Sequence, residues 1–304
     1  MRLGCWIATE RPFDDVLATA LEAERLGYDS VYLADHFMPQ TSPPAEPRLE
    51  AWTTLAALAA RTERVRLGVL VTGNTYRHPA ILAKMAATTD RISNGRLVLG
   101  LGAGWQRNEH EAYGISLPEN AELLGRLDEA CQVVRTLLDN TWSDFDGRWY
   151  HLERAPCEPK PVQTHLPLLV GVSGEQIAMG VAARHADIWN YWGTPETLAH
   201  KLAVLDAHCE RVGRDPSTLE RSTQALVFMH DDPAEVARLR EQATRQPSIF
   251  GSPAEISEIL GSYAELGVAE FILSDRTLGR DAGERFETMG RFVDEVAGPV
   301  HRAV

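Results

Sequence analysis

Short apolar runs alternate with amphipathic stretches from one end of the chain to the other. Most of the apolar runs lack alternating polar and apolar residues, which is typical of strands covered on both faces. Between them, apolar residues return every three or four positions, which predicts helices with one buried face. We therefore expect strands at residues 2–7, 29–34, 65–72, 96–103, 168–173, 186–192, 221–229 and 269–275.

The ends of several helices carry recognisable local signals. A capping residue, a first-turn proline and a glutamate at the third helical position occur at Asp232-Pro233 and again at Ser252-Pro253. Glycines stand where three helices are expected to end, at positions 27, 213 and 267. These signals support the alternation of helices and strands.

This alternation predicts an α/β fold, a (β/α)8 TIM barrel in which residues 1–304 form a single domain. An open doubly wound sheet is the alternative, but eight strands without a linker favour the closed barrel. The stretch from Trp105 to Pro167 is too long for one crossover. We expect an insertion there, after the fourth strand, with a helix and a hairpin that turns at Asp146-Gly147. A smaller insertion is expected after the seventh strand, around residues 244–253.

One unit is repeated near the two ends of the chain. The segments LGYDSVYLAD (26–35) and LGVAEFILSD (266–275) share Leu-Gly and then Leu-x-Asp at the same spacing. The repeat is short enough to arise by chance. As a pattern, it predicts the same helix–turn–strand arrangement at both positions.

Charge and composition narrow the range of partners. The net charge of −13 disfavours nucleic-acid binding, which needs a basic surface. No apolar run is long enough for a transmembrane helix, and MRLGCWIATERP at the start is charged too early for a signal peptide. The four cysteines are far apart, so we expect free thiols and no bound metal. These features predict a cytoplasmic protein without nucleic-acid or membrane partners.

The segment LVLGLGAGWQRNEH (97–110) is rich in glycine but does not match the dinucleotide fingerprint. That fingerprint needs G-x-G-x-x-G after the first strand of its unit. Here the glycines are Gly100, Gly102 and Gly104, they follow the fourth strand, and Trp105 comes next. Glycine inside a strand marks a close approach by a ligand or by another backbone. The sequence alone leaves both interpretations open.

Polar and aromatic residues gather where the predicted strands end, which is the functional end of a barrel. This rim has no histidine pair at metal-binding spacing and no G-x-S-x-G nucleophile motif. It suits a flat, conjugated small molecule. The rim residues are Asp35, His36, Phe37, Thr72, Gly73, Asn74, Tyr76, Gly104, Trp105, Glu109, Ser173, Gly174, Glu175, Asn190, Tyr191, Trp192, His230 and Asp275.

Three stretches resemble the luciferase-like monooxygenase superfamily. They are ADHFM, LVTGNTYRHPAILAKMAATTDRISNGRLVLGLGAGW and EHEAYG. The likeness is to the branch of oxidoreductases that use the deazaflavin coenzyme F420, and it implies hydride transfer between F420 and a small organic substrate. The same barrel also takes FMN, so an FMN-dependent monooxygenase using reduced flavin and O2 is the alternative. A non-catalytic flavin-binding protein is a third reading.

The resemblance implies roles for residues around the cofactor ring. Asp35 and His36 match positions beside the reactive centre, where a histidine can move a proton near neutral pH. Leu70 and Val71 match a non-prolyl cis peptide that backs the ring, although the residues themselves are equally compatible with a trans strand. Ala103 and Gly104 match contacts along the ring, and Asn190 either lines the pocket or fills the rim of the barrel.

The segment GVSGE matches the family's phosphate loop. Its residues are Gly171, Val172, Ser173, Gly174 and Glu175. Backbone N–H groups at the last three positions would meet the phosphate at the start of a helix, where the helix dipole favours an anion. Many relatives have more glycines here.

Two positions concern the substrate. Trp105 stands where related sugar-phosphate dehydrogenases carry a catalytic glutamate, which makes a glucose-6-phosphate dehydrogenase activity doubtful. Glu109 remains as a possible acid, or as a charge that stabilises the start of a helix. We expect the insertion after the fourth strand and the segment 244–253 to build the substrate pocket. A homodimer is expected only by analogy with similar barrels.

Overall fold

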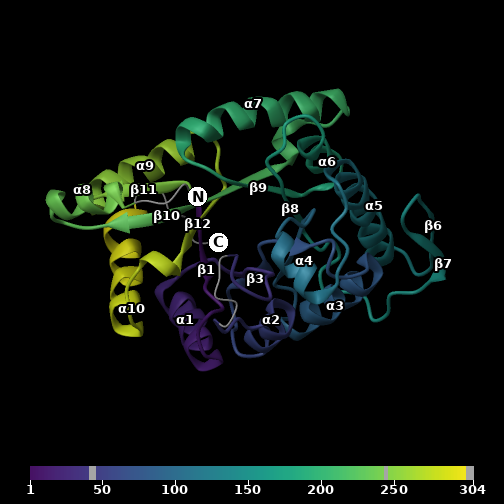
Figure 1. The fold of residues 1–304 in the computed structure, drawn as a ribbon, viewed down its shortest axis with the longest axis horizontal. Helices are drawn as coiled ribbons and strands as arrows, with labels where there is room; N and C mark the ends of the chain where they lie inside the picture. Colours follow the sequence, from purple (N-terminus) through teal and green to yellow (C-terminus); the bar gives the residue numbers. More distant parts are fainter. Residues whose placement is uncertain (41–45, 243–245, 299–304) are drawn as a thin grey trace.

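The computed structural model describes residues 1–40, 46–242 and 246–298. Eight parallel strands close into a barrel, and helices surround it (Figure 1). All eight predicted strands are confirmed. They are β1 (Arg2–Ile7), β2 (Ser30–Leu33), β3 (Arg66–Val69), β5 (Leu97–Gly102), β8 (Leu168–Gly171), β9 (Ile188–Trp192), β10 (Glu220–Met229) and β12 (Glu270–Ser274). Their order around the barrel is β12-β1-β2-β3-β5-β8-β9-β10, and β10 pairs with β12 to close it.

Helices follow the strands and cover the outside of the barrel. They are α1 (Phe13–Leu26), α2 (Ala51–Ala59), α3 (Pro79–Ile92), α4 (Arg107–Tyr113), α5 (Asn120–Asp139), α6 (Ala178–His185), α7 (Pro195–Arg211), α8 (Pro233–Glu241), α9 (Pro253–Glu265) and α10 (Ala282–Arg291). Two 3-10 turns at Pro216–Thr218 and Asp275–Thr277, and a π-helical segment at Phe292–Ala297, complete the helical elements. A large apolar cluster fills the layer between strands and helices. A smaller one fills the barrel interior, with Tyr32, Leu70, Val98, Leu169, Ile188 and Ile272.

The predicted helix signals act as expected. The Asp232 side chain accepts the Ala234 N–H at the start of α8, and Ser252 forms a full capping box with Glu255 at the start of α9. The three stop glycines, at positions 27, 213 and 267, all have positive φ angles of 73 to 90°. Only glycine adopts this conformation freely, which explains why these helices end there.

The repeated segment forms the same structure at both ends of the chain. A helix, a turn at glycine and a barrel strand occur in each copy, as α1–β2 and as α9–β12. In both copies the final aspartate is buried and forms an ion pair with an arginine, Asp35 with Arg77 and Asp275 with Arg11. Each pair ties the end of one strand to the loop after a neighbouring strand, so the repeat stabilises the rim of the barrel.

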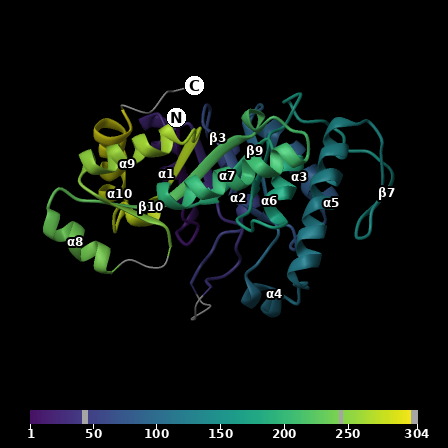
Figure 2. The same ribbon diagram turned by 90° about the horizontal axis from the view of Figure 1, so that it is seen from above.

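The insertion after β5 contains α4, α5 and the predicted hairpin, whose strands are β6 (Ser143–Asp146) and β7 (His151–Ala155). In Figure 2, α4 lies apart from the helices that surround the barrel. The prediction of a tight turn at Asp146-Gly147 is wrong, because Asp146 pairs with His151 and the loop spans residues 147–150. A carboxylate on α5 shapes this loop: Glu129 accepts the N–H groups of Arg148 and Trp149.

The insertion after β10 holds a strand that the sequence pattern did not predict. Strand β11 (Ser248–Gly251) pairs in parallel with the second half of β10, at Leu226–Met229. Strand β10 is ten residues long and pairs with β9 only through Gln224. Its carboxyl half therefore extends past the barrel and offers a free edge to β11. Residues 244 and 245 of the predicted insertion lie outside the described part of the chain.

A bulge at the end of β3 resolves the question of the glycines in 97–110. The peptide bond Leu70-Val71 is cis, as the resemblance implied, and the chain then rejoins β5 through β4 (Thr72–Gly73). A Cβ at position 100 would overlap the carbonyl oxygen of Val69. A Cβ at position 102 would lie 2.5 Å from a Val71 methyl group. The close approach is therefore made by another part of the backbone, and Gly100 and Gly102 leave room for the bulge.

Three features of the described residues concern cysteines, possible metal ligands and long apolar helices. The four cysteines are buried and free. Across residues 1–40, 46–242 and 246–298 there is no group of three or more His, Cys, Asp or Glu side chains arranged to hold a metal ion. Within the same ranges, no helix has the length and apolar character needed to cross a bilayer.

We expect Gly100→Ala to lower the free energy of unfolding by about 1–3 kcal/mol, the usual result of overpacking a close-packed interior. The added methyl group would push against the backbone of the bulge, which cannot move aside as a flexible side chain could. Urea denaturation measures the change. Gly261→Ala in α9 is the matched control, because a Cβ there meets nothing within 4 Å and alanine favours a helix. Equal effects of the two substitutions on the free energy of unfolding would contradict the view that Gly100 leaves room for the bulge.

Candidate active site

A cavity of about 550 Å³ opens at the carboxyl ends of the barrel strands. It adjoins a second cavity of about 470 Å³, with which it shares part of its wall. Ten of the predicted site residues line the first cavity: Asp35, His36, Leu70, Val71, Ala103, Gly104, Gly171, Val172, Ser173 and Gly174. Asn190 lines only the second cavity, whereas Glu109 and Glu175 line neither. The structure thus gathers most of the predicted site, and it places three of the residues beside or behind it.

The bulge at the end of β3 forms part of the cavity wall. Leu70 and Val71 both face the cavity, and the Val71 side chain lies between two strands that carry glycine. A Cβ at Gly171 would be 2.8 Å from one Val71 methyl group, and a Cβ at Gly102 would meet the other. Because neither strand has a side chain there, this part of the wall stays low and apolar. A flat ring could lie against it.

Asp35 is buried next to the bulge. Its carboxylate accepts the Gly73 N–H at 3.1 Å and forms an ion pair with Arg77 at 2.6 Å. Burial raises the pKa of Asp35, although the Arg77 guanidinium opposes that rise. Arg77 also binds Glu50 at 2.5 Å, so its charge is fully committed. Asp35 therefore offers the cavity a hydrogen-bond acceptor. Its partner Arg77, which is paired with two carboxylates, adds no free positive charge.

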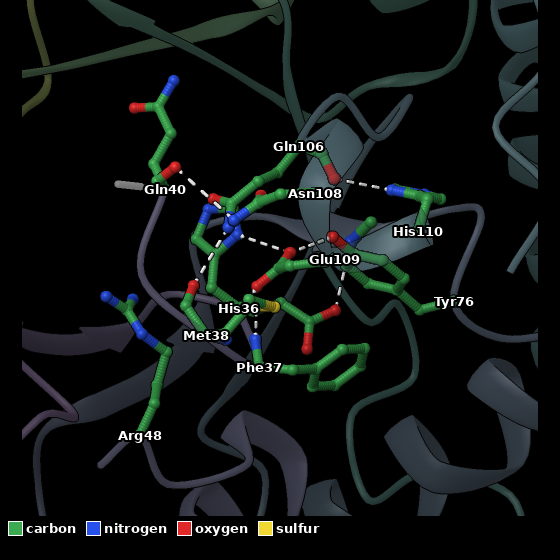
Figure 3. A network of polar contacts seen from close by, with 12 residues as sticks. His36, Phe37, Met38, Gln40, Arg48, Tyr76, Gln106, Asn108, Glu109 and His110 are labelled. Atoms are coloured by element: carbon green, nitrogen blue, oxygen red, sulfur yellow. Dashed lines mark hydrogen bonds and ion pairs between the residues drawn. The ribbon is translucent and has the colours of Figure 1, made fainter. Parts of the chain in front are cut away.

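The Glu109 carboxylate joins three segments of the rim (Figure 3). One oxygen accepts the backbone N–H groups of Phe37 at 2.5 Å and Met38 at 3.0 Å. The other lies 3.1 Å from Nδ1 of His36 and accepts the hydroxyl of Tyr76. Glu109 thus holds the loop after β2 and the segment after β4 against α4.

These hydrogen bonds decide the charge of Glu109. Burial of the side chain, which is fully buried, opposes ionisation. The hydrogen bonds from His36, Tyr76 and the Met38 N–H outweigh it and lower the pKa of Glu109 below its ordinary value of 4.5. Burial and the neighbouring Glu109 raise the pKa of Tyr76. At neutral pH the site therefore contains a glutamate anion that accepts bonds from a neutral tyrosine.

His36 has two different environments at its two ring nitrogens. An ionised Glu109 can only accept a hydrogen bond, so Nδ1 of His36 carries the hydrogen between them. Nε2 has no hydrogen-bond partner within the described residues, and the side chain faces the cavity. The ring of Trp105 meets the imidazole edge-on, with centroids 5.5 Å apart. This arrangement leaves Nε2 as the position that can take up or release a proton.

Residues in α4 and directly before it make further contacts with the same loops, and the sequence analysis did not predict these contacts. The side chain of Gln106 donates to the Met38 carbonyl at 3.0 Å, and that of Asn108 donates to the Pro39 carbonyl at 2.8 Å. His110 lies 2.7 Å from the hydroxyl of Thr75. All these partners are backbone groups or loop side chains far away in sequence, so no local spacing could have identified them.

The predicted phosphate loop lies between β8 and α6. Helix α6 begins at Ala178, after a turn at residues 175–177, so the loop does not lead directly into the helix as expected. No backbone N–H of Ser173, Gly174 or Glu175 donates a hydrogen bond within the described residues. Lys201, which the sequence did not single out, donates to the Ser173 carbonyl at 2.8 Å and pairs with the Glu175 carboxylate at 2.6 Å. Three free donors and a nearby cation suit an anionic group.

The two insertions contribute unequally to the cavity. The insertion after β5 supplies Trp105 and, from α5, Asn120, Leu123 and Leu124, as expected. The expectation for 244–253 is wrong for its described residues, since none of residues 246–253 lines either cavity. They pair instead with the outer part of β10. Their nearest link to the site is the Pro247 carbonyl, which accepts the indole N–H of Trp192 at 3.2 Å.

Comparison with known proteins places this chain in a family. It is 31% identical to an F420-dependent glucose-6-phosphate dehydrogenase of Microbacterium testaceum, over 92% of this chain and 84% of the relative. It is 29% identical to an F420-dependent hydroxymycolic acid dehydrogenase of Mycobacterium tuberculosis, over 94% of this chain and 78% of the relative.

Solved structures share the fold. An F420-dependent secondary alcohol dehydrogenase in complex with an F420-acetone adduct superimposes with a TM-score of 0.82 at 21% identity, over 99% of both chains. The monooxygenase RslO1 from Streptomyces bottropensis does so with a TM-score of 0.82 at 22% identity, over 98% of this chain and 99% of that one. The family model described as luciferase-like monooxygenase matches residues 1–266. The chain therefore belongs to the luciferase-like monooxygenase family.

Proposed function

We propose that this protein is an F420-dependent oxidoreductase that transfers a hydride between the deazaflavin and a small organic substrate. The observation that carries the proposal is His36, which Glu109 holds by Nδ1 and which presents Nε2 to an apolar cavity above the Leu70-Val71 bulge. Two relatives that align with most of this chain are F420-dependent dehydrogenases, and this favours F420 over FMN.

The cavity fits a planar ring with an anionic tail. Leu70 and Val71 offer a low apolar wall because Gly102 and Gly171 have no side chains beside them. Ala103 and Gly104 continue this wall along β5 and the residues after it. We assign the ring to this wall.

The tail belongs at the loop after β8. We assign its phosphate to the free N–H groups of Ser173, Gly174 and Glu175, with Gly171 and Val172 leading into the loop. Glu175 takes part through its backbone, because its side chain is paired with Lys201. The side chain of Asn190 donates to Ser222 at 2.9 Å and lines the adjoining cavity, so its role is to shape the wall.

The protein's own residues provide proton transfer and exclusion of water. When bound, F420 supplies two-electron hydride chemistry, because a deazaflavin lacks the ring nitrogen that supports one-electron and oxygen chemistry. His36 exchanges the accompanying proton with the substrate at Nε2. Glu109 is a positioning residue rather than the acid considered from sequence, since it is ionised and lies outside the cavity lining. Trp105, Leu123 and Leu124 shield the cavity from water.

We further propose that the protein acts in the cytoplasm, because its four cysteines are buried and free. We also propose that it has no nucleic-acid or membrane partners, because a net charge of −13 opposes binding to anionic polymers and surfaces. The homodimer expected by analogy stays a prediction.

Titration of the protein with F420 and with FMN tests the cofactor. We expect F420 to bind at least 100-fold more tightly, measured by quenching of tryptophan fluorescence. Tight binding of FMN alone would reverse the choice and favour a monooxygenase. Tight binding of F420 without turnover of any substrate would instead favour a binding protein.

We expect His36→Ala to reduce kcat by about 100-fold or more, the usual range for loss of a general acid or base. The dissociation constant of F420 should change by no more than about twofold, because Nε2 serves the substrate. Steady-state kinetics and the fluorescence titration measure the two effects. His151→Ala on the exposed hairpin is the control, and unchanged turnover of the His36 variant would remove this residue from the mechanism.

We expect Glu109→Gln to lower kcat and to destabilise the fold by about 2 kcal/mol at pH 7, since hydrogen bonds to a charged group contribute roughly 1.5–3 kcal/mol each. The folded-state pKa of Glu109 is depressed, so its contribution is present at pH values above the ordinary 4.5 and is lost as pH falls below it. Urea denaturation of both proteins between pH 7 and pH 4 should show their difference in stability narrowing below about pH 4.5. A constant difference across this range would show that Glu109 is not the titrating group.

A further inference from the structure

A further cleft, of about 580 Å³, lies at the opposite end of the barrel from the candidate active site. Its lining comes from α5, the last turn of α6, the residues after α7, and the segments that lead into β8 and β9. These segments stand at the amino ends of the strands, whereas the active-site cavity opens at the carboxyl ends. Among the described residues, none lines both this cleft and a cavity at the mouth.

Basic side chains outnumber acidic ones in this cleft, although the chain as a whole has a net charge of −13. Asp187 is the single acidic residue in the described lining. A local excess of positive charge can bind an anion even in an acidic protein. The basic lining residues are Arg135, Arg184, Arg214, His165 and His185.

Two carboxylates offset two of the three arginines. Asp187 accepts a hydrogen bond from Arg135 at 2.7 Å. Asp128 on α5, which does not line the cleft, accepts two from Arg184, at 2.6 and 3.0 Å. Each of these carboxylates also lies within 2.9 Å of a histidine nitrogen. Both carboxylates are therefore already shared, and neither is left for the third arginine.

Arg214 forms no ion pair with any carboxylate in the described part of the chain. Its guanidinium donates to the carbonyl oxygens of Ala183 and Ala186, at 3.2 and 2.7 Å, and to the hydroxyl and carbonyl of Thr218. These bonds cap the end of α6 and hold the guanidinium in place. Because all the acceptors are neutral, Arg214 leaves one positive charge over in the cleft.

The other two arginines keep unused hydrogen-bond donors. Arg184 binds Asp128 through Nε and Nη2, and its Nη1 has no acceptor among the described residues. Arg135 donates through Nη1 and Nη2, and its Nε has no acceptor in residues 1–40, 46–242 and 246–298. Guanidinium groups match the oxygens of phosphate. Three arginines from separate segments suit a phosphate, which has three acceptor oxygens, better than a carboxylate, which has two.

The rest of the lining is small and apolar. Val212 is 41% exposed, so the carbon atoms of a ligand can pack on it. The described lining contains no tryptophan, tyrosine or phenylalanine on which a nucleotide base could stack. The apolar lining residues are Cys131, Ala183, Ala186, Val212 and Gly213.

We propose that this cleft binds a small aliphatic phosphate ester, with the phosphate held by Arg135, Arg184 and Arg214 and the carbon chain against Val212. The phosphate supplies the negative charge that Arg214 lacks within the chain, and it accepts from the unused donors of the other two arginines. The site is separate from the proposed active site, and the proposal does not depend on the cofactor.

Isothermal titration calorimetry with monobutyl phosphate, at constant ionic strength, tests the class of ligand. We expect monobutyl phosphate to bind about 10-fold more tightly than inorganic phosphate, because its carbon chain covers apolar surface of the cleft. Pentanoate and 1-butanol, which lack the phosphate, should bind about 10-fold more weakly than monobutyl phosphate or not at all. Equal binding of any of these three compounds, tighter binding of AMP, or no binding of monobutyl phosphate at millimolar concentration would overturn the proposal.

Substitutions in the same titration locate the site. We expect Arg184→Gln to weaken binding of monobutyl phosphate about 10-fold, the usual effect of losing one hydrogen bond to a charged group. Arg135→Gln should have a similar effect and gives an independent test. The matched control is Arg238→Gln on α8, because Arg238 is also paired with one carboxylate, that of Glu235, but lies outside the cleft. Equal weakening by the Arg184 and Arg238 substitutions, or none by either cleft variant, would overturn the assignment.

Lys201→Gln separates this cleft from the loop after β8, which also suits a phosphate. Lys201 contacts that loop and does not line the cleft. Loss of monobutyl phosphate binding in the Lys201 variant, with unchanged binding in Arg184→Gln, would place the ligand at the loop and overturn the proposal.

Discussion

The buried carboxylate of Glu109 is the interaction on which the site depends. An anion removed from water must be fully hydrogen-bonded, because an unsatisfied charge in the interior is strongly destabilising. Glu109 meets this requirement with two backbone N–H groups, the Tyr76 hydroxyl and Nδ1 of His36. His36, Phe37 and Met38 belong to the loop after β2, and Tyr76 lies in the segment after β4. Satisfying one charge therefore fixes the loops and orients the imidazole in the same step.

The second constraint is the space left by glycines around the Leu70-Val71 bulge. Three glycines on two neighbouring strands, at positions 100, 102 and 171, leave room for the backbone and side chain of the bulge. Any larger residue at these positions would collide with it. The low wall that we assign to the cofactor ring is thus a consequence of barrel packing. The three glycines therefore shape both the packing of the barrel and the wall of the cavity.

Family membership and local chemistry give different information about the substrate. The relatives include enzymes that act on a sugar phosphate, yet the described walls of this cavity contain no cation to receive a phosphate. The chain as a whole is strongly acidic, with a net charge of −13, but that charge lies outside the cavities. The large apolar surface at the mouth comes from Trp105, which lines both cavities and is 56% exposed. We expect substrate preference to depend on the side chains at the mouth, since the relatives have different substrates.

The sequence by itself determined the features that depend on neighbouring residues. Apolar runs located all eight barrel strands, and local caps such as the Ser252–Glu255 box marked the helix ends. The family resemblance, carried by short continuous segments, pointed to the Leu70-Val71 cis peptide, which the structure contains. The roles that it implied for His36 and for the loop at 171–175 stay predictions.

Only the tertiary structure decided what depends on contacts between distant segments. The partners of Glu109 come from two loops, after β2 and after β4, and its role follows from them and not from its place on α4. The hairpin loop is longer than predicted because Glu129 on α5 organises it, and β11 forms because β10 extends beyond the barrel. These outcomes depend on distances in space, which a pattern along the chain does not contain.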